Sequence, residues 1–148
     1  MTFKAHAIEK VREFISAFDC PHDPVLWKNL MVEEANEVII ADNAVDRLKE
    51  CMDFMYVCAG YQIVTPVLED IEGTSEEHAL FDWAIDVVTQ VIVSVGSQAN
   101  VIEAFDRVHR SNMSKLGEDG KPVRRADGKI LKGPNYAPPS LDDLVQGA

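Results

Sequence analysis

Residues 30–41 read Leu-Met-Val-Glu-Glu-Ala-Asn-Glu-Val-Ile-Ile-Ala, with three acidic residues in an otherwise mostly apolar stretch. Glu34 and Glu37 are three residues apart, so they share one face of a helix, and Glu33 shares that face with Glu37 at a spacing of four. Nearly every other position around them is apolar. Helices that are apolar on most sides are buried ones, so we expect these acidic side chains to point into a helical bundle.

The rest of the chain has the same helical periodicity. Phe3, Ala7, Val11 and Phe14 recur at spacings of three and four, which indicates an amphipathic helix. Asn43 is placed as a helix N-cap, with Asp46 three residues on. We expect helices over residues 3–18, 25–41, 44 to about 63, 76–95 and 98–116. The fold class is therefore all-α, an antiparallel bundle of four or five helices.

After residue 116 the composition changes to Gly, Pro, Lys and Arg. Val123–Arg125 and Lys129–Leu131 flank a turn signal, Asp127-Gly128, and this predicts a small β-hairpin. We expect one domain, residues 1–116, with residues 117–148 as its extended C-terminal arm. The arm either covers a site of its own chain, lies on a neighbouring subunit, or is an exposed basic segment without a function.

Charge is unevenly distributed along the chain. The 148 residues carry a net charge of -11, but residues 1–106 have 6 basic and 20 acidic residues, whereas residues 107–148 have 8 and 5. Such an acidic body repels a phosphate backbone, which argues against polymeric nucleic acid as a partner. An acidic body with a basic tail suits a site where cations mediate between carboxylates and an anionic substrate.

Cysteine usage and hydropathy indicate the compartment. Cys20, Cys51 and Cys58 form no CxxC pattern, which fits a reducing cytoplasm better than a disulfide scaffold or a zinc site. The most apolar stretch, residues 87–95, is too short to span a bilayer, and the N-terminus does not resemble a signal peptide. We therefore expect a cytoplasmic protein without a membrane partner.

The acidic residues of two successive helices should meet. Counting from Asn43, Glu37 lies six residues before and Glu50 seven after, while Glu34 lies nine before and Asp53 ten after. At a rise of about 1.5 Å per residue, the two pairs come to nearly equal heights on antiparallel helices. Carboxylates at this density destabilise a fold unless something neutralises them.

A divalent cation is the natural neutraliser of such a groove. Mg²⁺ prefers carboxylate oxygens and keeps coordination positions open for phosphate oxygens, and Mn²⁺ has similar preferences. A di-iron site is less favoured, because no acidic pair has the Glu-x-x-His pattern of those bundles. The remaining alternative is a solvated acidic face that binds no metal.

These residues resemble a known family. Glu34-x-x-Glu37, twelve intervening residues and Glu50-x-x-Asp53 resemble the ExxE…ExxD signature of the all-α nucleoside triphosphate pyrophosphohydrolases. That superfamily includes MazG, the dimeric dUTPases, dCTP pyrophosphatase and the phosphoribosyl-ATP pyrophosphohydrolases. The segments that resemble its MazG-like branch are HRSNMSKL (109–116), DGKP (119–122), DGK (127–129) and KGPNY (132–136). The resemblance covers nearly the whole chain and is poorest over residues 62–95.

The resemblance implies cleavage of a nucleoside triphosphate, such as dUTP or dCTP, between the α- and β-phosphates to give the monophosphate and pyrophosphate. It implies Mg²⁺, or Mn²⁺, on Glu34, Glu37, Glu50 and Asp53, and a homodimer or dimer of dimers with the arm of one subunit on another. Glu34 and Glu33 would be catalytic; Glu33 is either an additional ligand or the carboxylate that orients the attacking water. The substrate-binding residues implied are Trp27, Arg110, Asn112, Lys115, Lys132 and Tyr136.

Three alternatives stay open. Trp27 is at least as well explained as a core residue as by stacking on a base, and Lys115 alone could be a solvated cation at a helix end. A non-catalytic acidic helical module that binds a basic partner is the competing function. That module predicts neither dependence on divalent metal nor turnover.

Overall fold

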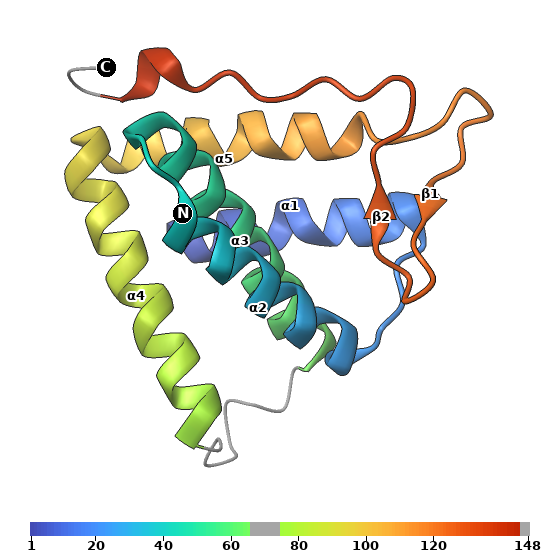
Figure 1. Cartoon of the computed structure of the whole chain (residues 1–148), viewed down its shortest axis with the longest axis horizontal. Coiled ribbons are helices and arrows are strands. Elements are labelled where there is room, and N and C mark those ends of the chain that lie inside the picture. Colours follow the sequence, from blue (N-terminus) through green and yellow to red (C-terminus); the bar gives the residue numbers. More distant parts are fainter. Residues whose placement is uncertain (66–74, 146–148) are drawn as a thin grey trace.

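The computed structural model describes residues 1–65 and 75–145 of the chain. Its elements are α1 (Phe3–Phe18), α2 (Pro24–Ile40), α3 (Ala44–Val64), α4 (Ser75–Val95), α5 (Gln98–Met113), β1 (Val123–Arg124), β2 (Ile130–Leu131) and a 3₁₀ turn, η2 (Asp142–Leu144). The predicted all-α fold with a small hairpin is confirmed (Figure 1).

The helix boundaries follow from local chemistry. Asp23 caps α2 by accepting a hydrogen bond from Val25 N at 3.0 Å. Asn43 Oδ1 accepts a hydrogen bond from Asp46 N at 2.9 Å, so the predicted N-cap of α3 is confirmed. The fifth helix ends at Met113, three residues earlier than predicted, because Leu116 instead forms an antiparallel bridge with Pro122.

The core lies where α1, α3 and α5 cross, and α2 packs along α3 (Figure 1). Tyr56 of α3 is at its centre: its ring stacks on Phe105 of α5 at 5.5 Å and meets Phe14 of α1 edge-on at 5.5 Å. Phe54 and Phe105 are fully buried. Burial of each such ring is worth roughly 1.5–3 kcal/mol, so α3 is fixed by aromatic packing from two sides.

The C-terminal arm folds back on its own chain. In the hairpin, Val123 pairs with Leu131 and Arg124 with Ile130, and the turn places Gly128 at φ 96°, where a side chain would be strained. Beyond the hairpin the chain runs along α5 (Figure 1), where Leu141 is fully buried. The arm therefore packs on its own chain over this stretch.

Two arginines hold the arm in place. Arg107 of α5 donates to Asp143 Oδ1 at 2.6 Å and to the Ser140 carbonyl at 3.0 Å. Arg124 of β1 donates to the carbonyl oxygens of Phe18, the last residue of α1, and of Asp19, which follows it. The hairpin therefore lies over the end of α1, close to the start of α2.

Among the described residues, no helix is long and apolar enough to cross a membrane.

Candidate functional site

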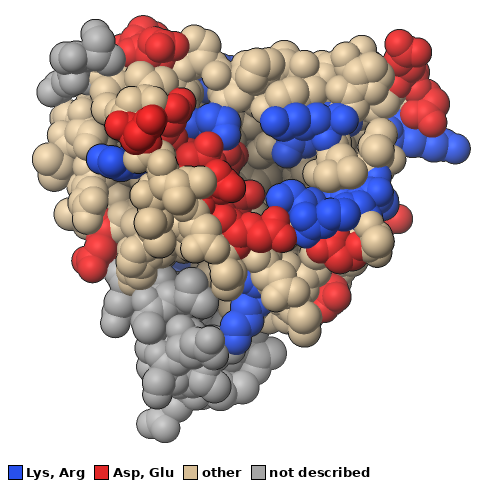
Figure 2. All heavy atoms as spheres, viewed as in Figure 1, with Lys and Arg blue, Asp and Glu red and all other residues tan. Residues whose placement is uncertain are grey.

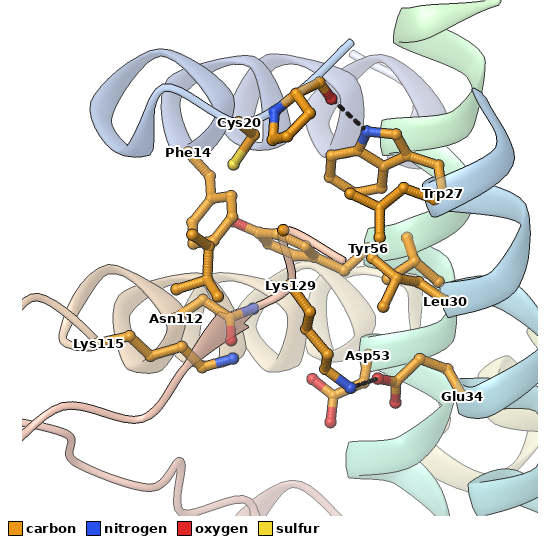
Figure 3. A pocket seen from close by; sticks show the side chains of 15 residues that line it. Phe14, Cys20, Trp27, Leu30, Glu34, Asp53, Tyr56, Asn112, Lys115 and Lys129 are labelled. Atoms are coloured by element: carbon orange, nitrogen blue, oxygen red, sulfur yellow. Dashed lines mark hydrogen bonds and ion pairs between the residues drawn. The ribbon is translucent and has the colours of Figure 1, made fainter. Parts of the chain in front are cut away.

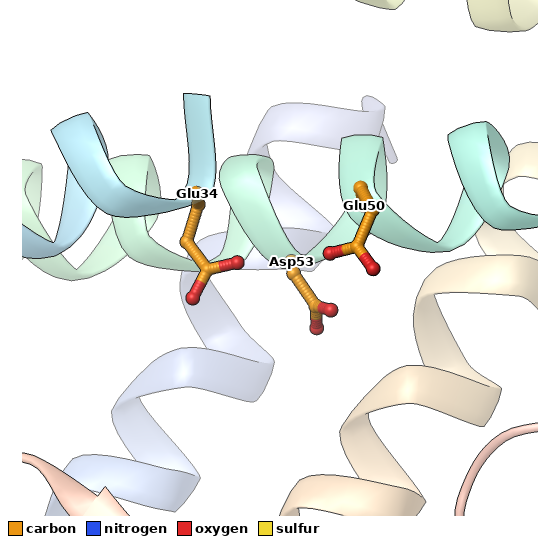
Figure 4. Close-up of side chains that lie close together, drawn as sticks. All are labelled: Glu34, Glu50 and Asp53. Atoms are coloured by element: carbon orange, nitrogen blue, oxygen red, sulfur yellow. The ribbon is translucent and has the colours of Figure 1, made fainter. Parts of the chain in front are cut away.

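Three carboxylates from two helices meet in the groove between α2 and α3. They belong to Glu34 of α2 and to Glu50 and Asp53 of α3, and one oxygen of each lies within 4.8 Å of the other two. Figure 4 shows the three side chains converging from the two helices. The structure thus brings together three of the four acidic residues that the sequence spacing placed at equal heights.

Crowding and burial raise the pKa of two of the three carboxylates, those of Glu34 and Glu50. Burial, together with the charges of Asp53 and Glu50, raises the pKa of Glu34 to about 7. Burial also raises the pKa of Glu50, with Asp53 and Glu37 adding to it and Lys49 opposing it. A carboxylate cluster of this kind favours a cation that would neutralise it.

Glu37 lines the same groove as the cluster but is not one of its three members. Its side chain is exposed, one turn along α2 from Glu34. Its charge contributes to the raised pKa of Glu50, so Glu37 lies close enough to interact with the cluster. Glu37 therefore lies at the edge of the site.

Lys49, which the sequence analysis did not identify, contacts the cluster directly. Its Nζ lies 3.0 Å from Glu50 Oε1 and 3.0 Å from Asp53 Oδ2. Burial lowers the pKa of Lys49, but Asp53 and Glu50 outweigh that effect and raise it. The available sequence signal was the spacing of four between Lys49 and Asp53 on one helix.

The hairpin brings a second lysine to the other end of the cluster. Lys129 Nζ lies 2.9 Å from Glu33 Oε2 and 4.0 Å from Glu34 Oε1. Arg125 also donates to Glu33, at 2.9 Å, and the pKa of Glu33 is lowered by these partners. Both oxygens of Glu33 are thus engaged by the hairpin, and Glu33 lies outside the three-carboxylate cluster.

Basic and polar side chains of α5 and the arm form the opposite wall of the groove. The groove has a volume of about 470 Å³. Its non-acidic lining includes Lys49, Ser111, Asn112, Lys115, Lys129, Lys132 and Tyr136. Figure 2 shows acidic and basic side chains side by side on this face. An anion bound in the groove would contact lysines on one side. On the other side the carboxylates would repel it unless a cation lay between them.

The predicted substrate-binding residues separate into two groups. Asn112 and Lys115 line the groove, as do Lys132 and Tyr136, with the ammonium of Lys132 4.9 Å from the Tyr136 ring centre. Burial lowers the pKa of Lys115, while the carboxylates of Asp53 and Glu34 act in the opposite direction. Arg110 does not line the groove; its side chain is exposed and lies 3.5 Å from Glu103 Oε1.

A small aromatic pocket opens beside the carboxylates. It has a volume of about 80 Å³, and Figure 3 shows Phe14, Trp27, Leu30 and Tyr56 around it with the acidic and basic side chains at one end. The other lining residues labelled in Figure 3 are Cys20, Glu34, Asp53, Asn112, Lys115 and Lys129.

Trp27 is both a core residue and a wall of this pocket. Only 4% of its surface is exposed, and its Nε1 donates to the Pro21 carbonyl at 3.2 Å. The indole ring packs against Gly60 of α3, where a methyl group would overlap it. The two interpretations of Trp27 are thus compatible in this structure.

Buried polar groups continue behind the pocket. The Tyr56 hydroxyl lies 2.9 Å from His109 Nδ1, and His109 Nε2 lies 3.2 Å from Glu13 Oε2. Burial lowers the pKa of His109. The negative charge of Glu13 acts to raise this pKa, but burial outweighs it. His109 is buried and partnered at both ring nitrogens, which is typical of a packed structural histidine.

Comparison with known proteins finds one significant structural likeness. The chain is similar to the crystal structure of a "putative NTP pyrophosphohydrolase" from Exiguobacterium sp. 255-15, with 24% sequence identity. The match covers 90% of this chain and 88% of that chain, with a TM-score of 0.46. No protein-family model matches the sequence, and no curated protein matches it significantly.

Proposed function

We propose that the protein is a metal-dependent nucleoside triphosphate pyrophosphohydrolase. It would cleave a (deoxy)nucleoside triphosphate to the monophosphate and pyrophosphate, as the resemblance of its motifs implies. One observation supports the proposal above all. Three clustered carboxylates and several lysines line the same groove, and a small aromatic pocket opens beside the carboxylates.

The donor set suits a hard divalent cation. Glu34, Glu50 and Asp53 offer only carboxylate oxygens, which Mg²⁺ and Mn²⁺ prefer, and Glu37 at the groove edge is the fourth proposed ligand. Ligands of one Mg²⁺ are at most about 4.2 Å apart, so oxygens spaced within 4.8 Å need only small side-chain rotations to share an ion. Such an ion would polarise the phosphates and neutralise charge on the pyrophosphate leaving group.

Residues of the opposite wall would bind the triphosphate. Lys115, just after α5, lines the groove together with Lys129 and Lys132 of the arm, so their ammonium groups can donate to phosphate oxygens. Asn112 lies between the groove and the aromatic pocket and can donate to the sugar or to a phosphate. Arg110 points elsewhere, and the proposal assigns it no contact with phosphate.

The two catalytic candidates take different roles. Glu34 would act as a ligand, holding the ion that polarises the attacking water; its pKa of about 7 belongs to the metal-free cluster, and a bound cation would lower it. Glu33 is held by Arg125 and Lys129, which favours a role in positioning the hairpin over one in orienting water.

The aromatic pocket sets the proposed class of base. At about 80 Å³ it is far below the roughly 300–1,000 Å³ of sites for drug-sized ligands. A single-ring pyrimidine, as in dUTP or dCTP, fits this limit better than a purine. Trp27, Tyr56 and Phe14 would contact the ring, and Tyr136 would close the groove on the phosphate side.

We further propose a homodimer, or a dimer of dimers, in the cytoplasm. Val25, Val32 and Ile39 are spaced by seven on α2 and are all exposed, which leaves an apolar stripe that a second copy can cover. The three cysteines are free and buried, as expected in a reducing compartment.

Product analysis tests the proposed reaction. Purified protein with Mg²⁺ and each of the common deoxynucleoside triphosphates should release the monophosphate and pyrophosphate in equal amounts, fastest with a pyrimidine substrate. Release of a diphosphate and inorganic phosphate would contradict the cleavage position. No turnover with any nucleotide would favour the non-catalytic acidic module.

A further inference from the structure

Lys49 lies among the carboxylates that the proposed function assigns to the metal. It precedes Glu50 by one residue and Asp53 by one helical turn, and its Nζ is 3.0 Å from an oxygen of each. Both contacts come from the same helix, α3, so they form as soon as that helix forms. In this structure the ammonium is the nearest cation to two of the three clustered carboxylates.

An ammonium and a divalent ion compete for the same oxygens. A divalent ion binds carboxylates at about 2.1 Å, and its charge repels a neighbouring ammonium. The Lys49 side chain is 33% exposed and unbranched, so it can swing into solvent without disturbing the core. Lys129 contacts Glu34 more distantly, at 4.0 Å, and is held by Glu33, so it does not compete for the same oxygens.

We propose that Lys49 is a tethered counter-ion, which neutralises Glu50 and Asp53 in the metal-free protein and is displaced when a divalent ion binds. This inference rests on the proposed metal site. It has two consequences: Lys49 stabilises the metal-free fold, and it weakens metal binding, because part of the binding free energy is spent on breaking its two ion pairs.

Calorimetric titration with Mn²⁺ alone tests the exchange. The comparison is between the wild-type chain, Lys49→Met and a matched control, Lys121→Met, which removes one positive charge at an exposed position outside the groove. We expect Lys49→Met to bind Mn²⁺ about tenfold more tightly than the wild type, and Lys121→Met to differ little. In EDTA, Lys49→Met should melt below the wild type, and saturating Mn²⁺ should remove this difference.

The outcomes separate the exchange from the metal site. If the wild type binds Mn²⁺ and Lys49→Met binds it equally or more weakly, Lys49 is not displaced and the exchange is overturned while the metal site stands. If neither protein nor the control binds Mn²⁺, the metal site is refuted and the exchange with it. Should Lys49→Met fail to fold, Lys49→Gln keeps a polar side chain and gives the same comparison.

Discussion

Lys129 Nζ lies 2.9 Å from Glu33 Oε2, joining the hairpin to α2 across 96 positions of the sequence. Arg125 donates to the other oxygen of Glu33 at 2.9 Å. This carboxylate, together with the bonds of Arg124 to the end of α1, holds the segment that brings Lys129 to the groove. The groove wall depends on this contact between elements that are far apart in the chain.

Glu33→Gln should loosen the hairpin and leave the chemistry intact. Because the ion pairs are partly exposed, we expect the free energy of unfolding to fall by no more than about 1 kcal/mol. The KM for the nucleotide should rise several-fold, with kcat changed less. Steady-state kinetics of the wild type and Glu33→Gln check this. The control is Glu118→Gln, which changes an exposed acidic residue in the loop after α5. A steep fall in kcat at constant KM would instead make Glu33 a ligand or a water-orienting group.

The raised pKa of Glu34 gives the metal-free protein a defined pH dependence. The folded state keeps this proton up to a pH of about 7, whereas the unfolded state releases it near 4.5. Between these values the folded state binds more protons, so stability falls as the pH rises, by up to roughly 3 kcal/mol. Denaturant unfolding in EDTA from pH 5 to 8 should show this loss in the wild type and a clearly smaller one in Glu34→Gln, where Glu50 keeps a raised pKa. Parallel curves for the two proteins would refute it.

Gly60→Ala should destabilise the protein through Trp27. A methyl group on Gly60 overlaps the buried indole ring, which cannot move away as a flexible side chain would. Overpacking typically costs about 1–3 kcal/mol, which exceeds the roughly 1 kcal/mol gained by replacing Gly in a helix. A double-mutant cycle with Trp27→Leu measures the coupling. The same penalty in both backgrounds would show that the clash is not the cause.

Much of the fold could be predicted from the sequence because it follows from local patterns. Apolar spacings located the helices, Asn43 located a helix start, and Asp127-Gly128 located the hairpin turn. The equal heights of Glu34 and Asp53 about the interhelical turn followed from the helical rise, and the structure brings these two residues together. Each of these inferences uses only neighbouring residues or one turn between helices.

The remainder of the site depends on the direction in which each side chain leaves its helix. The number of residues between a side chain and the interhelical turn does not give that direction. Glu37 has the right height but projects to the groove edge, and Glu33, rotated by about 100° from Glu34, meets the hairpin instead. Arg110 lies about 200° around α5 from Asn112 and so faces away from the groove. The partners of Glu33 come from the distant arm, and no local pattern connects them.

The proposed dimer should be visible in solution. Light scattering is expected to give at least twice the chain mass of 16.5 kDa at micromolar concentration. Ile39 is 69% exposed, so Val32→Glu combined with Ile39→Glu should shift the population to monomer without unfolding it. Val123→Glu, at an exposed position of the hairpin, is the control. A monomeric wild type would rule out the assembly.

The most direct test of the metal-dependent cleavage is the rate of pyrophosphate release from dUTP and dCTP, with Mg²⁺ and with EDTA, by the wild type, Glu34→Gln, Asp53→Asn and Glu118→Gln. If the carboxylate cluster holds the metal, the wild type and Glu118→Gln turn over with Mg²⁺ and stop in EDTA. Glu34→Gln and Asp53→Asn should each lose at least about 100-fold, since loss of a ligand misplaces the ion. Hydrolysis near the wild-type rate by Glu34→Gln or Asp53→Asn, or turnover undiminished by EDTA, would contradict the assignment.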